Sequence, residues 1–152
     1  MTDQDESETL PEFDQTLAWM VFDAKEALVA PLRPIFRDYN LTEAQWRAIW
    51  VINDRRIIDA TGLAEAAMLH PTSVSRILRD LEKRKLIMRQ PIAGDRRRNA
   101  VALSPEGREL VRTLSWHVLH FMHEQSKRFD SDRVAHLVDE LMALKDAIKD
   151  VK

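Results

Sequence analysis

Apolar residues recur every three or four positions at both ends of the chain, and this spacing limits the fold more than any other feature. The N-terminal series consists of Phe13, Leu17, Met20, Val21, Ala24 and Leu28, and the C-terminal one of Val134, Leu137, Val138, Leu141 and Ile148. A period near 3.6 residues is that of an amphipathic α-helix. Only three of the 152 residues are glycine, which disfavours the turn-rich β-sandwich and barrel classes. The sequence therefore predicts a largely helical protein.

The middle of the chain predicts short helices followed by a β-hairpin. Thr42, Asp59 and His70-Pro71 each precede an apolar series, as residues at helix starts do. The expected elements are helices over about 43–52, 60–67 and 71–85, strands over 86–89 and 99–103 joined by a turn at 93–98, and helices over 105–129 and from 131.

This order predicts an α+β fold, mostly α, in which a winged helix-turn-helix lies between long terminal helices. We expect a single domain over residues 11–152 after a disordered acidic tail over 1–10. Within it, the winged helix-turn-helix covers about 40–104, and dimerisation helices cover about 12–36 and 105–150. The terminal helices are too long to bury their apolar faces on so small a centre, so we expect a homodimer.

Composition excludes several function classes. The chain has no cysteine, which rules out a thiol redox sensor, a Cys-ligated zinc site, an iron–sulfur cluster and a cysteine nucleophile. No run approaches the ~18 apolar residues of a membrane span, and the N-terminus is acidic, so we expect a cytoplasmic protein. Phosphate-binding loops, nucleophile elbows and HExxH motifs are also missing from the sequence. We therefore expect neither an enzyme nor a bound cofactor.

Charge is distributed unevenly along the chain. Residues 1–40 carry nine acidic and three basic side chains, whereas residues 62–98 carry nine basic and four acidic ones. A basic block of this kind favours a polyanionic partner, although a solvated charged surface would also produce it.

The predicted helix-turn-helix and hairpin supply residues suited to DNA. In this motif the second helix enters the major groove. Its outward positions are Thr72, Ser73, Ser75, Arg76, Arg79 and Lys83. Arg76 suits a guanine edge, whereas Arg79 and Lys83 suit phosphates. The hairpin turn carries Asp95, Arg96, Arg97 and Arg98, and arginines are attracted to narrow minor grooves.

Three segments resemble the MarR (multiple-antibiotic-resistance regulator) family. They are Asn40–Arg47, Val74–Ile87, and Gly94–Arg98 with the following Leu103-Ser104-Pro105-Glu106-Gly107. Within the family, Arg33-Pro34-Ile35 before the first segment is most similar to repressors of homoprotocatechuate and aromatic-acid degradation.

The resemblance implies a homodimeric repressor that binds a pseudo-palindromic operator in double-stranded DNA. It gives Arg97 the role of the minor-groove arginine and Asp95 that of its partner. It also implies release by a small aromatic acid bound between the dimerisation helices and the DNA-binding lobe. Trp19, Trp46 and Trp50 would wall such a site, and Lys25, Arg33 or Arg47 would pair with the carboxylate. The alternative is that these residues serve core and dimer packing.

Two other classes of protein remain open. His117, His120 and His123 on the long helix suggest a zinc-responsive metalloregulator. Residues six apart point roughly 120° away from each other on a helix, however, so the three side chains do not converge, and we expect no metal site. The third possibility is a helical adaptor that forms the same dimer without binding DNA.

Overall fold

The computed structural model describes residues 10–92 and 95–149, and for residues 92 and 95–99 it describes the backbone alone. The chain divides into two compact units, Met1–Thr42 and Glu43–Lys152. The expected acidic tail lies outside the described residues except for Leu10. The expectation of one domain over 11–152 stays a prediction.

The regular elements in the described part of the N-terminal unit are all helices. It contains two single-turn 3₁₀ helices, η1 (Phe13–Gln15) and η2 (Ala30–Leu32), and two α-helices, α1 (Leu17–Val29) and α2 (Arg33–Asp38). Thr16 begins α1, because its side-chain oxygen accepts a hydrogen bond from the backbone N–H of Trp19 at 3.3 Å. The N-terminal apolar series of the sequence lies along η1 and α1, and α1 buries none of its residues within the protomer.

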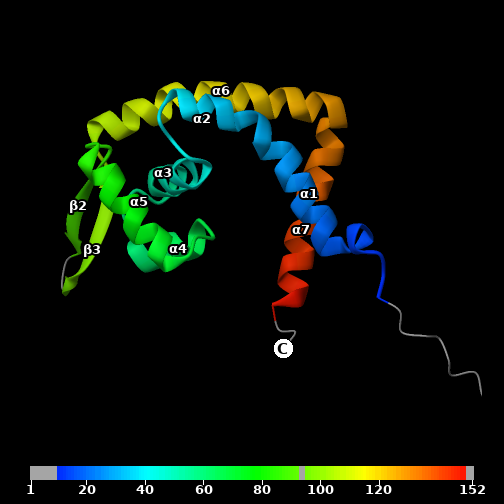
Figure 1. The fold of residues 1–152 in the computed structure, drawn as a ribbon, viewed down its shortest axis with the longest axis horizontal. Helices are drawn as coiled ribbons and strands as arrows, with labels where there is room; N and C mark the ends of the chain where they lie inside the picture. The colour runs from blue at the N-terminus through cyan, green and yellow to red at the C-terminus, as the bar shows by residue number, and fades with distance from the viewer. Residues whose placement is uncertain (1–9, 93–94, 150–152) are drawn as a thin grey trace, which may run out of the picture. The chain divides into compact units, whose positions relative to one another are not determined.

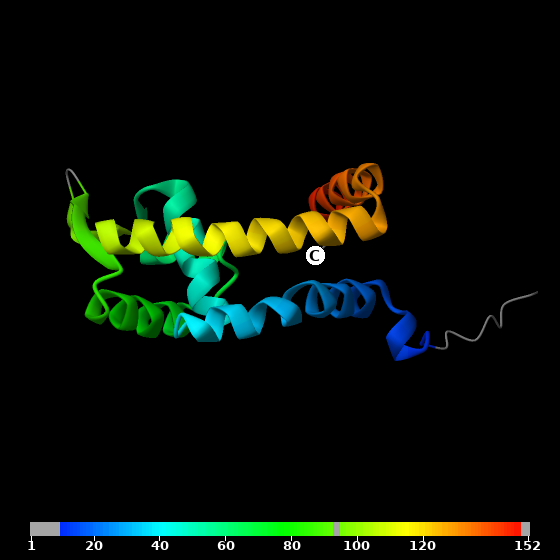
Figure 2. The same cartoon turned by 90° about the horizontal axis from the view of Figure 1, so that it is seen from above.

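The second unit contains the helix-turn-helix and the hairpin. Its elements are α3 (Glu43–Arg55), β1 (Ile58–Asp59), α4 (Ala60–Ala66), α5 (Pro71–Lys83), β2 (Ile87–Ile92), β3 (Asp95–Leu103), α6 (Pro105–Phe129) and α7 (Ser131–Ile148). The three strands form an antiparallel sheet in the order β1-β3-β2, with Ile58 opposite Val101 and Ile87 opposite Leu103. Figure 1 shows α3, α4 and α5 gathered with the hairpin at the N-terminal end of α6, and Figure 2 shows α7 turning away at the other end. The expected fold class is confirmed.

The core of this unit lies between α3, α5, the sheet and the first half of α6. Its fully buried large side chains are Ile49, Ile52, Leu63, Val74, Leu81, Val101, Leu114 and Val118. On α5, Val74, Ile77, Leu78 and Leu81 are all buried, as their spacing predicts.

A hydrogen-bonded junction at Ser104 joins the base of the hairpin to α6. Ser104 Oγ donates to the Lys85 carbonyl at 2.6 Å and accepts from the backbone N–H of Gly107 at 2.9 Å. The backbone N–H of Ser104 donates to the carbonyl of Leu86 at 3.0 Å. Gly107 is buried against this carbonyl, at a position where a side chain would collide with it. The direction of the hairpin is therefore fixed by the start of α6.

Two predicted boundaries are wrong. The first helix of this unit continues to Arg55 instead of ending at 52, because polar residues also extend a helix whose last turn faces solvent. It ends where Arg56 takes a left-handed φ of 69° and its N–H bonds to the Ile52 carbonyl at 2.9 Å. In the hairpin, β2 continues to Ile92 instead of ending at 89, and β3 begins within the expected turn, so Asp95–Arg98 belong to a strand. Strand pairing is made by the backbone, and alternating apolar side chains are not required for it.

Candidate functional site

The helix-turn-helix is built from α4, a short turn and α5. Asp59 Oδ1 accepts the N–H of Gly62 at 2.7 Å and so caps α4. Met68 in the turn has a left-handed φ of 51°, which reverses the chain between the two helices. The side chain of His70 accepts the N–H of Thr72 at 3.3 Å, and Pro71 occupies the first helical position of α5.

The outward face of α5 presents hydroxyls near its start and cations further along. Thr72, Ser73, Ser75, Arg76, Arg79 and Lys83 are all exposed. Ser75 Oγ donates to the Pro71 carbonyl and Arg79 Nε to the Ser75 carbonyl, each at 3.3 Å. These local bonds keep both side chains close to the helix. The arrangement leaves small side chains where a helix approaches base edges most closely.

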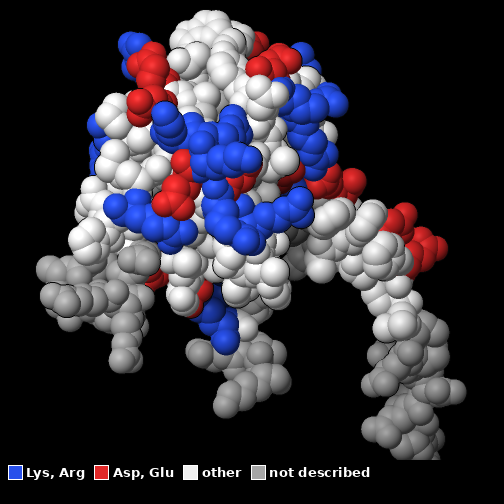
Figure 3. Space-filling model, turned by 60° about the vertical axis from the view of Figure 1, so that its left-hand side comes forward, with Lys and Arg blue, Asp and Glu red and all other residues white. Residues whose placement is uncertain are grey.

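An arginine lies near each acidic residue of α5. Arg84 Nη1 lies 3.9 Å from Asp80 Oδ2, which also accepts from Gln45 Nε2 of α3 at 2.7 Å, and Arg89 Nε on β2 lies 3.2 Å from Glu82 Oε2. Among the described residues, Arg76 and Lys83 have no ion-pair partner. Figure 3 shows Lys and Arg side chains gathered on this side of the molecule, with fewer acidic ones between them. The face therefore has free positive charge for a polyanion.

The expected wing residues lie at the far end of the hairpin. The backbone of Asp95–Arg98 begins β3, and Asp95 pairs with Ile92 across the hairpin. The side chains of Asp95, Arg96, Arg97 and Arg98 lie outside the described part of the structure, so their contacts with DNA stay a prediction.

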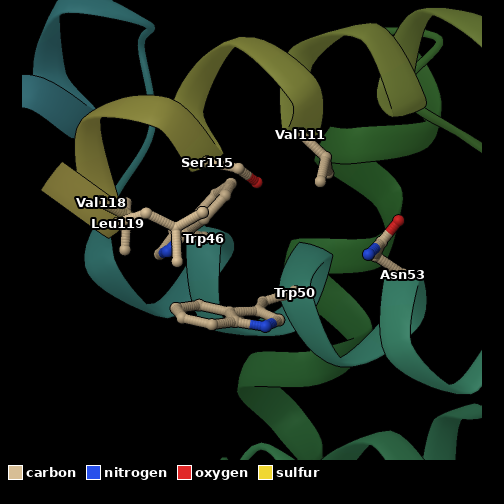
Figure 4. Close-up of a pocket in the computed structure, with 7 residues that line it drawn as sticks. All are labelled: Trp46, Trp50, Asn53, Val111, Ser115, Val118 and Leu119. Atoms are coloured by element: carbon tan, nitrogen blue, oxygen red, sulfur yellow. The ribbon is translucent and has the colours of Figure 1, made fainter. Parts of the chain in front are cut away.

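A cavity of about 200 Å³ opens between α3 and α6. Its lining residues are Trp46, Trp50 and Asn53 of α3 and Val111, Ser115, Val118 and Leu119 of α6. The two indole rings lie 5.7 Å apart at an angle of 54°. Figure 4 shows them facing the α6 side chains, with the Ser115 hydroxyl and the Asn53 amide extending into the space between the helices. An apolar cavity of about 150 Å³ holds benzene, so this one has room for one substituted ring.

Trp50 also lines a second, wider cavity of about 470 Å³. Its lining residues are Arg47, Trp50, Val51, Asp54, Arg55 and Ala66. Arg47 Nη1 lies 3.6 Å from Glu43 Oε1, whereas Arg47 Nε is buried and has no hydrogen-bond partner among the described residues. The Arg47 side chain as a whole is 38% exposed, so its guanidinium offers a donor to an acidic ligand.

The structure brings together Trp46, Arg47 and Trp50 from the predicted ligand set. The other three lie in the N-terminal unit. There, the Trp19 ring stacks on Phe22 with centroids 5.5 Å apart. Lys25 Nζ and Arg33 Nη2 each lie 2.8 Å from Glu26, and hydrogen bonds from Lys25 and then Arg33 lower the pKa of that carboxyl below its usual range.

Sequence reasoning missed Asn53 and the α6 wall of the first cavity. The signal for the wall was present, since Val111, Leu114 and Val118 are spaced three and four apart with Ser115 beside them. Asn53 was missed because the sequence predicts that the helix ends at 52, whereas α3 continues to Arg55 and so carries Asn53 into the cavity.

The histidines of α6 do not form a metal site with other described residues. The Trp116 ring stacks on His120 with centroids 5.7 Å apart and meets His117 edge-on at 5.0 Å. Within residues 10–92 and 95–149, no group of three or more His, Asp or Glu side chains is placed to hold a metal ion. None of the helices described there is long and apolar enough to cross a bilayer.

Large apolar side chains are exposed along the terminal helices. On α6, Trp116 is 67% exposed and Leu119 61%. Similar residues on α1 and α7 are Leu17, Met20, Phe22, Leu28, Leu137, Val138, Met142 and Ile148. Apolar faces of this extent mark interaction surfaces in soluble proteins.

Comparisons with known proteins agree with the winged helix-turn-helix. The sequence model of the MarR family matches residues 41–98. The HTH-type transcriptional regulator FarR of Neisseria gonorrhoeae is 29% identical over 131 residues, which are 86% of this chain and 85% of FarR. The homoprotocatechuate degradative operon repressor of Escherichia coli is 27% identical over 132 residues, 85% of this chain and 89% of the repressor.

A solved structure is similar over nearly the same length. The crystal structure of NadR in complex with 4-hydroxyphenylacetate superposes with a TM-score of 0.80 at 27% identity, covering 90% of this chain and 96% of that one. The relatives reported by sequence are a transcriptional regulator and an operon repressor rather than enzymes.

Proposed function

We propose that the chain is a member of the MarR family of transcriptional regulators, and that it is a repressor that a small aromatic carboxylate releases from its operator. The observation that carries the proposal is the combination, within one unit, of a free basic recognition helix and a ring-sized cavity lined by two indoles. The first is suited to DNA and the second to a flat ligand.

DNA is contacted by α5 and the hairpin. Thr72, Ser73 and Ser75 allow close approach to the major groove, and Arg76 reads a base edge. Arg79 and Lys83 bind phosphates. At the tip of the hairpin, Asp95 orients Arg97 toward a minor groove while Arg96 and Arg98 contact the backbone. This assignment follows the exposure of α5 and the position of the strand that carries the arginines.

The functional unit is a homodimer. The apolar faces left exposed on α1, α6 and α7 support this assignment, because a second copy would cover them. A twofold dimer presents two recognition helices to a pseudo-palindromic operator whose half-sites are about 34–36 Å apart.

The releasing ligand is a hydroxylated aromatic acid. Its ring binds beside Trp46 and Trp50, and its carboxylate pairs with Arg47. The neighbouring proteins support the ligand class, because one represses a homoprotocatechuate operon and another was crystallised with 4-hydroxyphenylacetate.

Operator binding and its relief test the proposal directly. A duplex selected from a random pool serves as operator, and 4-hydroxyphenylacetate, homoprotocatechuate, protocatechuate and salicylate are titrated while binding and tryptophan fluorescence are followed. We expect one of these acids to lower operator affinity roughly 5–150-fold, the range of typical allosteric coupling. The neutral amide of the active acid is the control, because it retains the ring but not the charge. If no acid changes either signal at millimolar concentration, the ligand assignment fails while the DNA assignment stands.

Substitutions on α5 test the DNA assignment separately. Arg76→Ala should relax base preference at one position in each half-site, at a cost of about 1–3 kcal/mol. Lys83→Ala should weaken selected and random duplexes alike and flatten the salt dependence. The assigned roles would be contradicted if Arg76→Ala, like Lys83→Ala, weakened the selected and the random duplexes equally.

A further inference from the structure

The cavity between α3 and α6 contains two polar side chains with nothing to bind. Asn53 and Ser115 are both half-buried there. Among the described residues, neither the Asn53 amide nor the Ser115 hydroxyl has a hydrogen-bond partner. They extend into the same space from opposite helices (Figure 4). The polar atoms of both side chains remain accessible to water, so a ligand group that bonds to both replaces that water and joins the two helices.

The lining of this cavity also restricts the charge of what it holds. Among the described residues that line it, none is Lys, Arg, Asp or Glu, and apart from Asn53 and Ser115 they are tryptophan, valine and leucine. A carboxylate placed there would lose its hydration without gaining a cation, which is strongly unfavourable. A phenolic hydroxyl is neutral, and it both donates and accepts. It therefore matches a serine hydroxyl and an amide together.

The carboxylate of the ligand finds a cation in the neighbouring cavity. Trp50 lines both cavities, and Arg47 lines the second one. The Arg47 side chain is 38% exposed, so its guanidinium is the cation that we assign to the carboxylate of a ligand whose ring hydroxyl binds Ser115.

We propose that Ser115 and Asn53 form a subsite for a hydroxyl on the aromatic ring, so that this protein discriminates hydroxyaryl acids from the same acids without the hydroxyl. The inference rests on the proposed function, because it assumes that the cavity receives the ring of the releasing acid. It adds the residues that determine ligand specificity and the substituent that they recognise.

The test compares two ligands that differ by one hydroxyl, 4-hydroxyphenylacetate and phenylacetate. Calorimetry on the full-length protein gives the dissociation constant of each. We expect the wild type to bind 4-hydroxyphenylacetate about tenfold more tightly, the range of the net gain from one or two hydrogen bonds exchanged with water. Ser115→Ala should reduce that ratio at least about threefold by weakening only the hydroxylated ligand. Adding Asn53→Leu should bring the ratio close to one.

Two further variants separate the possible explanations. Ser126→Ala is the control, because it removes a hydroxyl from the same helix. Ser126 Oγ contacts Ser131 Oγ at 3.0 Å, and Ser126 lines neither cavity. The ratio of the two dissociation constants should therefore equal that of the wild type. Ser115→Leu fills the cavity, so both ligands should be lost while thermal unfolding of the free protein is retained.

The outcomes distinguish this subsite from the proposed function itself. The subsite would be refuted if Ser115→Ala and the double variant left the ratio of the two dissociation constants unchanged. Both acids would still bind in that case, and the proposed function would stand. If neither acid binds the wild type and no other aromatic acid affects operator binding, the proposed ligand class is wrong and the subsite falls with it.

Discussion

Replacing Gly107 by alanine tests how the start of α6 holds the hairpin. A Cβ built on Gly107 would overlap the Leu86 carbonyl oxygen and lie 3.3 Å from Leu103 Cδ2. The obstacle is backbone at the start of the hairpin, so no side-chain rotation relieves it. Overpacking of this kind typically costs about 1–3 kcal/mol. Alanine regains about 1 kcal/mol by its higher helix propensity.

The same carbonyl accepts the backbone N–H of Ser104 at 3.0 Å. Moving it away from a new methyl group therefore also stretches a buried hydrogen bond, which contributes about 1 kcal/mol. We expect Gly107→Ala to lower the free energy of unfolding by about 1–3 kcal/mol. For a chain of this length, this corresponds to a fall in Tm of roughly 2–12 °C.

Thermal unfolding at fixed protein concentration measures the effect, and Gly62→Ala in α4 is the matched control. A Cβ at Gly62 would meet only side-chain atoms, Asp59 Oδ1 and Ile58 Cγ1, both at 3.2 Å. Both are side-chain atoms that need to move by only a few tenths of an ångström, although Asp59 Oδ1 is also the capping acceptor, so the control should stay within about 1 kcal/mol of the wild type. A Tm for Gly107→Ala equal to or above that of the wild type would show that α6 does not fix the hairpin as described.

Three further expectations concern assembly, DNA and capping. Sedimentation should give a dimer at micromolar concentration, and a stable folded monomer would contradict the role assigned to the exposed faces of α1, α6 and α7. Arg97→Ala should weaken binding mainly to operators with A·T-rich flanks, as competition with G·C-flanked duplexes would measure. Asp59→Ala removes the 2.7 Å cap on α4 and should lower the free energy of unfolding by about 0.5–2 kcal/mol, whereas an unaltered denaturation midpoint would show that the cap contributes nothing.

Elements with strong local signals were predictable from the sequence. The start of α6 at Ser104-Pro105 combines a capping hydroxyl with a proline at the first helical position. The four buried positions of α5 follow from their spacing alone. The end of α3 was not predictable in the same way. It depends on the left-handed conformation of Arg56, and a non-glycine residue seldom adopts this conformation.

The site was predictable only in part, because its two walls come from distant segments. Trp46 and Trp50 share a face of one helix, so their proximity follows from helical periodicity. The juxtaposition of Asn53 with Ser115 arises from the packing of α3 on α6, and no pattern within either segment encodes it. Lys25 and Arg33 were chosen for their charge, and both already pair with Glu26 in the N-terminal unit.

The position of α3 connects the cavity with the recognition helix. Trp46, Trp50 and Asn53 of this helix line the cavity, and Gln45 in its first turn donates to Asp80 of α5 at 2.7 Å. A ligand relieves repression only to the extent that it binds the DNA-free conformation more tightly than the DNA-bound one. A coupling of about 1–3 kcal/mol therefore requires only one or two contacts that differ between the two conformations. Bonds from a ring hydroxyl to Asn53 and Ser115 are of this size, and they join α3 to α6. The ring hydroxyl that decides which acid binds therefore also influences the distance between α3 and α6. Because α3 is bonded to α5, the position of α5 changes with it.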